Sequence, residues 1–200
     1  NMALAQVKTK YAVFADNDVV VMKGWLSELI NCAEETGCAI VSPLTCQDMP
    51  FHENIHFAGG ELEIKEEKKD GEIQRFIHET HTYKQGIKHF EINPPLKRGP
   101  IGYTEAHCFL IRTDILKKIN GFDENVKGTR EHVDFSLMVR QAGRMIYLEP
   151  KSIMTFMSHF SAAKLEPWEE DFYNLRWSDA WEYDTLKYLL KKWDLTESSY

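Results

Sequence analysis

The 200-residue sequence lacks the features that mark several common classes of protein. Its four cysteines form no CxxC pair and fit no known zinc-ligand spacing, so we expect reduced thiols. No apolar run approaches the roughly 20 residues of a membrane-spanning helix. The net charge is −7 and no run of Lys and Arg is present, which argues against nucleic-acid binding. The remaining composition is typical of one globular domain with a sizeable core.

The stretch Tyr11–Trp25 organises the rest of the chain. Residues suited to a buried strand lead into the triplet Asp16, Asn17 and Asp18, and a second apolar run follows. Two carboxylates at the end of an apolar strand are costly unless a cation neutralises them. A divalent metal that also binds phosphate is the natural candidate, because valines at the fifth and sixth positions exclude an EF-hand. A surface turn is the alternative interpretation.

Hydrophobic periodicity predicts alternating strands and helices along the chain. The expected strands cover 11–15, 38–42, 56–64, 72–78, 105–112 and 145–148, and the expected helices cover 23–35, 114–120, 130–142 and the segment after 167. Strand, helix, strand is the order of a parallel sheet with a right-handed crossover. A solvated charged turn over 65–71 predicts an exposed hairpin. We therefore expect an α/β fold with a mixed, mostly parallel sheet flanked by helices and a C-terminal helical segment.

A second group of polar residues opens the expected helix over 130–142. Glu131 and Asp134 are three residues apart and share a helix face, with His132 between them. The helix N-terminus favours the anionic form of a carboxylate, and these side chains could supply a general base. A solvated first turn is the alternative. His159 follows the last strand and Pro150, and its interest comes from its place in the series.

Taken in order, these motifs resemble the family 2 glycosyltransferases of the GT-A fold. The series is strand, Asp-x-Asp, Gly-Trp-Leu, Gly-Phe-Asp-Glu, Glu-x-x-Asp, strand-Pro and a late His, and it covers residues 11–160. The resemblance implies a Rossmann-like domain that holds Mn²⁺ or Mg²⁺ against the diphosphate of a nucleotide sugar. By this resemblance Asp16 and Asp18, mainly Asp18, would coordinate the metal, and His159 would be a further ligand. Asn17 would lie in the same donor-binding turn.

The resemblance also implies that the acidic helix start supplies the base for the acceptor hydroxyl. The family usually reads Glu-Asp-x-Asp there, whereas this sequence reads Glu131, His132, Val133 and Asp134. The base position of the family therefore falls on His132. The assignment stays open among Glu131, His132 and Asp134, and an inactive member is left open as well.

The expected function is metal-dependent transfer of a sugar from a nucleotide-sugar donor to a hydroxyl of a glycan, a lipid-linked molecule or a protein, with inversion. The alternative is a non-catalytic GT-A-like module that binds a glycan or a partner. A nucleotidyl or phosphoryl transferase is a third interpretation, but it would need a Gly-rich phosphate loop that this sequence does not contain.

The expected organisation is a GT-A-like domain over 1–163 and a helical extension over 164–200 packed on it. Because the strand at 11–15 is apolar enough to be central, we expect the nucleotide-binding strands to precede residue 1. Trp168, Trp177 and Trp181 have a spacing that favours core packing over sugar stacking. We expect a cytoplasmic location; attachment at the membrane periphery and a homodimer are left open.

Overall fold

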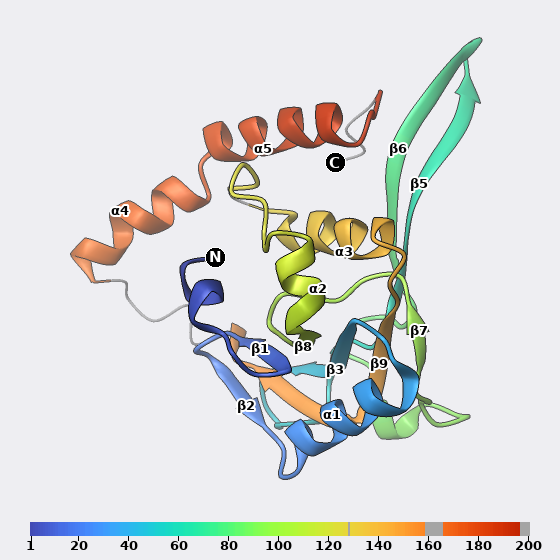
Figure 1. The fold of residues 1–200 in the computed structure, drawn as a ribbon, viewed down its shortest axis with the longest axis vertical. Helices are drawn as coiled ribbons and strands as arrows, with labels where there is room; N and C mark the ends of the chain where they lie inside the picture. Colours follow the sequence, from blue (N-terminus) through green and yellow to red (C-terminus); the bar gives the residue numbers. More distant parts are fainter. Residues whose placement is uncertain (128, 159–165, 197–200) are drawn as a thin grey trace.

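The computed structural model describes residues 1–127, 129–158 and 166–196. They form a main sheet with helices packed on it and a long two-stranded hairpin that projects away from it (Figure 1). The strands are β1 (Tyr11–Ala15), β2 (Val19–Val21), β3 (Ile40–Gln47), β4 (Ile55–Phe57), β5 (Gly60–Lys69), β6 (Glu72–His81), β7 (Gly99–Ile101), β8 (Cys108–Arg112) and β9 (Ile146–Phe156). The helices are α1 (Trp25–Thr36), α2 (Thr113–Lys118), α3 (Glu131–Gln141), α4 (Pro167–Arg176) and α5 (Asp179–Lys192), with 3₁₀ turns η1 (Met2–Gln6) and η2 (His89–Glu91).

The main sheet has the order β1-β8-β3-β9-β2, with β4 beside β3 and β7 beside β9. β3 and β9 are parallel, while β8 lies antiparallel between β1 and β3. β1, β3 and β9 therefore run in one direction, and the connection from β1 to β3 contains the oppositely directed β2 and then α1. The α/β fold of GT-A type with C-terminal helices is confirmed. Strand directions differ in detail: among the described residues β3–β9 is the one parallel pairing, and β2, β4, β7 and β8 each pair antiparallel with their neighbours.

Two predicted strand ends were wrong, and both concern proline. β3 continues through Pro43 and β9 continues through Pro150, where the expected strands stopped. The β3–β9 register shifts after Pro43, and such an irregularity accommodates a residue that cannot donate a ladder hydrogen bond. The β5–β6 hairpin is also longer than expected, because an Asp70-Gly71 turn suits a two-residue connection and lets the flanking charged residues pair as strands.

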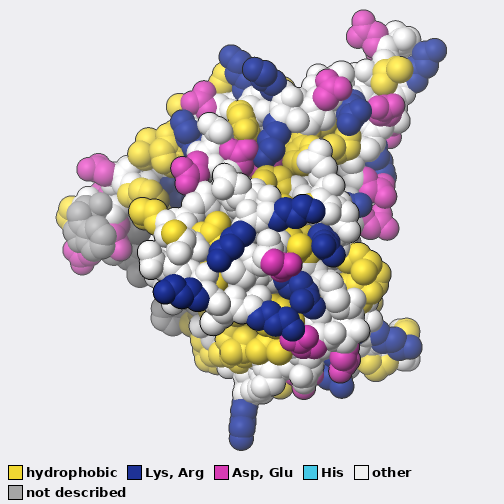
Figure 2. Space-filling model, in the orientation of Figure 1, with side chains coloured by type: hydrophobic (Ala, Val, Ile, Leu, Met, Phe, Trp, Pro, Cys, Tyr) yellow, Lys and Arg dark blue, Asp and Glu magenta, His cyan; other side chains and the backbone are white. Residues whose placement is uncertain are grey.

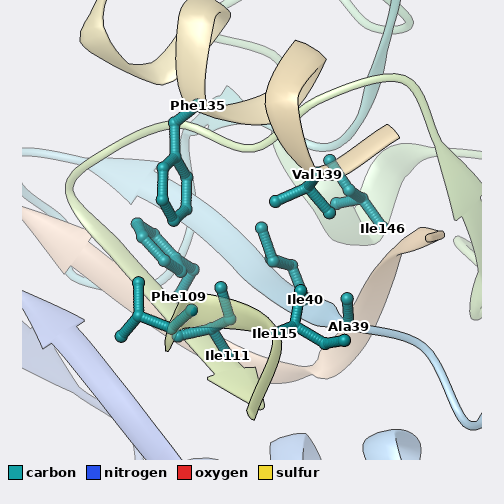
Figure 3. Close-up of a cluster of buried hydrophobic side chains, with 9 residues drawn as sticks. Ala39, Ile40, Phe109, Ile111, Ile115, Phe135, Val139 and Ile146 are labelled. Carbon is teal, nitrogen blue, oxygen red and sulfur yellow. The ribbon is translucent and has the colours of Figure 1, made fainter. Parts of the chain in front are cut away.

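The core between the sheet and α3 determines where the start of α3 lies (Figure 3). Ile40 and Phe109 from the sheet face Phe135 and Val139 of the helix, and all four are buried. The rings of Phe109 and Phe135 are 5.7 Å apart. Burying one such side chain stabilises the fold by about 1.5–3 kcal/mol. α3, whose first turn carries the predicted base residues, is therefore packed against the sheet through Phe135 and Val139.

The C-terminal helices differ in how they pack. α5 lies along α3 in Figure 1, and Leu189 of α5 and Trp193, just after it, join the buried cluster of Val133 and Leu137. α4 carries several exposed hydrophobic side chains, which Figure 2 shows around the arm at the left. Trp177, just after α4, is 55% exposed, so the prediction that it packs in the core was wrong.

The predicted domain boundary at residue 163 lies outside the described residues and stays a prediction. Within the described residues, no helix is long and apolar enough to cross a membrane.

Candidate active site

The register of β1 and β8 places Asp16 beside His107. Ala15 lies opposite Cys108 at the end of this antiparallel pair, so the next two residues face each other. The Asp16 N–H donates to the His107 carbonyl at 2.9 Å. The Asp16 Oδ2 atom lies 3.1 Å from Nδ1 of His107. The first residue of the Asp-Asn-Asp triplet therefore has an imidazole partner within the chain.

Both carboxylates of the triplet are exposed, and that of Asp16 is 51% accessible to solvent. The premise that burial forces a cation onto them was therefore wrong, because water already solvates them. Their oxygens are nevertheless accessible, and oxygen atoms are the ligands that Mn²⁺ and Mg²⁺ prefer. The Asp18 carbonyl accepts a hydrogen bond from Met157 N–H at 3.1 Å, so the chain just after β9 lies beside the turn. The predicted ligand His159 lies outside the described residues.

A second imidazole, that of His56 on β4, lies next to His107. The two ring centroids are 5.4 Å apart. The His107 ring stacks on Phe156 at 4.2 Å, and the His56 ring meets the same phenyl ring edge-on at 4.6 Å. Glu105 completes the group: the ligand atoms of His56, Glu105 and His107 all lie within 4.8 Å of one another.

Glu105 also belongs to a second group, with Glu79 of β6 and His132 of α3. Their ligand atoms again lie within 4.8 Å of one another. The Nε2 atom of His132 is 3.6 Å from Oε1 of Glu79. Burial lowers the pKa of His132, but Glu79, Glu105 and Glu131 raise it more, and the net pKa is above its ordinary value. Burial raises the pKa of Glu79, but His132 and Arg130 lower it more, so that carboxyl is held ionised.

Of the three predicted base residues, His132 is the one beside Glu105. Glu131 lies 3.6 Å from the guanidinium of Arg176, at the end of α4. Asp134 is 1% exposed and accepts hydrogen bonds from Trp193 Nε1 and Lys192 Nζ, both at 2.8 Å. Two residues along a helix point to opposite sides, so His132 and Asp134 serve different surfaces. Asp134 attaches α5 to α3.

His56, Glu79, Glu105 and His107 were not identified from the sequence. They belong to no contiguous motif, and the expected strand over 105–112 placed Glu105 and His107 inside a strand. β8 instead begins at Cys108, where the pairing with β1 begins. The available sequence signal was that His56 stands between Ile55 and Phe57 of an apolar strand and that His107 directly precedes one.

The profile of the family described as "Glycosyl transferase family 2" matches residues 1–120, more than half of the chain. The chain belongs to this family. This family 2 glycosyltransferase chain also resembles a crystal structure of GalNAc-T7 with UDP, GalNAc and Mn²⁺, with a TM-score of 0.51 and 11% identity. The match covers 78% of this chain and 29% of that protein, so the chain spans less than a third of its neighbour. It shows the GT-A fold. No curated protein matches the chain.

Proposed function

We propose that the chain carries the metal and acceptor part of a site that moves a sugar from a nucleotide-sugar donor to a hydroxyl acceptor. Family membership and the neighbour crystallised with UDP, GalNAc and Mn²⁺ support this proposal. The observation that carries it is the position of Glu105. This carboxylate lies beside His107, the partner of Asp16, and also beside His132, the partner of Glu79. The Asp-Asn-Asp turn and the predicted base helix therefore border one polar cluster.

A divalent ion, Mn²⁺ or Mg²⁺, would be held by the exposed carboxylates of Asp16 and Asp18. The fit is one of ligand chemistry: both side chains offer hard oxygen atoms that are open to solvent. When bound there, the ion neutralises charge on the diphosphate leaving group. Asn17 in the same turn stays a predicted donor-binding residue, and His159 stays a predicted ligand.

The base in this proposal is His132. The acceptor hydroxyl donates its proton to the imidazole, and the Glu79 carboxylate stabilises the imidazolium that forms. Glu105 can accept a hydrogen bond from a neighbouring acceptor hydroxyl and so orient the sugar. Attack of the acceptor oxygen on the anomeric carbon, opposite the departing diphosphate, gives inversion.

Calorimetry on the full-length protein tests the metal assignment. Nucleotide-sugar binding is measured with and without Mn²⁺ for the native protein, for Asp18→Asn, and for Asp184→Asn as a control at an exposed position of α5. We expect the first variant to lose Mn²⁺-dependent binding by at least about tenfold and the control to keep it. Unchanged binding in Asp18→Asn would remove the metal from this turn.

Donor turnover in the same samples separates the two candidate functions. An enzyme releases the nucleoside diphosphate when metal and an acceptor or water are present. Metal-dependent binding without any release would instead favour the non-catalytic binding module.

A further inference from the structure

We infer that His56, Glu105 and His107 form a second metal site, which takes a Zn²⁺-like ion and is distinct from the Mn²⁺ site proposed on the Asp-Asn-Asp turn. Two imidazoles and one carboxylate are the protein ligands of many catalytic zinc centres. The three ligand atoms already lie within 4.8 Å of one another. Around a tetrahedral Zn²⁺, with bonds of about 2.0–2.1 Å, ligand atoms are roughly 3.4 Å apart. Binding would therefore draw the ligand atoms together by at most about 1.4 Å.

The two imidazole rings are oriented as metal-binding histidines usually are. Nδ1 of His107 meets the Asp16 carboxylate at 3.1 Å, and Nδ1 of His56 meets Oε1 of Gln47 at 3.1 Å. The amide of Gln85 also reaches the His56 nitrogen, at 3.2 Å. In the described part of the chain the hydrogen bonds of both rings use Nδ1. The Asp16 carboxylate can only accept, so it places the hydrogen of His107 on Nδ1 and leaves the Nε2 lone pair for a metal. At His56 the Gln47 oxygen favours the same tautomer, whereas the Gln85 N–H group would need Nδ1 as its acceptor.

Packing and charge at the group also favour a cation. Phe156 is 9% exposed and contacts both imidazole rings, so their positions are set by the end of β9. Glu105 lies within 4.8 Å of Glu79, and a cation on Glu105 would relieve the repulsion between the two carboxylates. In this arrangement Asp16 orients a metal ligand through His107.

The two sites differ in the metal ion that their ligand types favour. Imidazole nitrogen favours Zn²⁺ and Co²⁺, whereas the carboxylate oxygens of the Asp-Asn-Asp turn favour Mn²⁺ and Mg²⁺. Three protein ligands leave a fourth position for water or a substrate oxygen, which is the pattern of catalytic rather than structural zinc. This site shares Glu105 and, through His107, Asp16 with the proposed transferase site, but its binding of a metal needs neither donor nor acceptor.

The experiment titrates the metal-free full-length protein with Zn²⁺ by calorimetry and with Co²⁺ by visible absorption, without any nucleotide sugar. We expect loss of at least about 100-fold in Zn²⁺ affinity for His56→Gln and His107→Gln, and about 10–100-fold for Asp16→Asn. The matched control is His81→Gln, whose ring lies 6.5 Å from that of His56 but outside the group. It keeps the native affinity.

Circular dichroism and the melting temperature establish that each variant folds. Absence of Zn²⁺ binding by the native protein, or native affinity in both folded variants His56→Gln and His107→Gln, would overturn the site. The two proposals fail separately. Loss of donor binding in Asp18→Asn bears on the transferase site alone, whereas the Zn²⁺ titration contains no donor and bears on the His56 group alone.

Discussion

Replacing Asp134 tests whether this residue stabilises the fold or acts as the general base. Its carboxylate is buried between α3 and α5, where it accepts from Trp193 and Lys192. Asp134→Ala deletes both charge-assisted hydrogen bonds and leaves the Trp193 N–H buried without that acceptor. Lys192 keeps its other partner, Asp123, at 2.7 Å.

The size of the effect follows from these contacts. A buried donor left unpaired costs about 1–3 kcal/mol. Breaking a buried ion pair costs about 3–5 kcal/mol, and the retained Lys192–Asp123 contact places this case near the lower end. We therefore expect Asp134→Ala to lower the free energy of unfolding by about 3 kcal/mol. For a protein of this size that corresponds to a fall of about 6–12 °C in melting temperature. Asp134→Asn, which keeps an acceptor for Trp193, should lose less.

The assay compares Asp134→Ala with His132→Gln in the full-length protein. Melting temperature is measured by calorimetry, and sugar-transfer turnover is measured well below the lowest melting temperature. We expect Asp134→Ala to melt early and to keep turnover within about tenfold of native. His132→Gln should melt close to the native temperature and lose about 10²–10⁴-fold in turnover, the usual range for a general base.

The reverse result would refute this reasoning. If Asp134→Ala melts like the native protein but is inactive, while His132→Gln is active, then Asp134 is the base and α5 must move to expose it. If both folded variants keep native turnover, the base lies outside the helix start.

Two further predictions concern ion pairs. Glu149 is 1% exposed and pairs with Arg98, which also pairs with Glu35, 65% exposed. Urea unfolding should show a loss of about 3 kcal/mol for Glu149→Gln and under about 1 kcal/mol for Glu35→Gln; equal losses would contradict the role of burial. Burial raises the pKa of Asp123, but hydrogen bonds from Lys192 and neighbouring groups lower it more, so its net pKa lies well below the ordinary 3.8. Its stabilisation is therefore complete above about pH 4 and lost as pH falls further. Asp123→Asn should flatten the fall in unfolding free energy between about pH 4 and pH 2, and an unchanged slope would contradict this assignment.

Local patterns in the sequence were sufficient to predict the bounds of those elements that local interactions determine. The strand over 11–15 was predicted with the bounds it has, because its five residues suit a strand and the polar triplet ends it. The end of α1 was visible from Gly37, which adopts the left-handed conformation with φ of 69°. The path of β3 through Pro43 was not visible, because pairing with β9 along most of the strand outweighs the one missing donor.

The same distinction applies to the candidate site. The Asp-Asn-Asp triplet and the start of α3 are contiguous motifs, so residue spacing alone pointed to them. The different surroundings of the three polar residues at the start of α3 could not be predicted from the sequence. Glu131, His132 and Asp134 are equally polar in the sequence, and only the packing of α4 and α5 gives Glu131 and Asp134 partners other than Glu105.

The sequence by itself determined the family, the α/β class and the position of the Asp-Asn-Asp turn on which a metal site is proposed, because these depend on short runs of residues and their order. The tertiary structure decided which side chains meet. His56, Glu79, Glu105 and His107 come from segments up to about fifty residues apart. They converge through the register of β1 with β8 and the pairings of β4 with β3 and of β6 with β5. Such convergence depends on long-range backbone pairing, to which no local spacing in the chain corresponds.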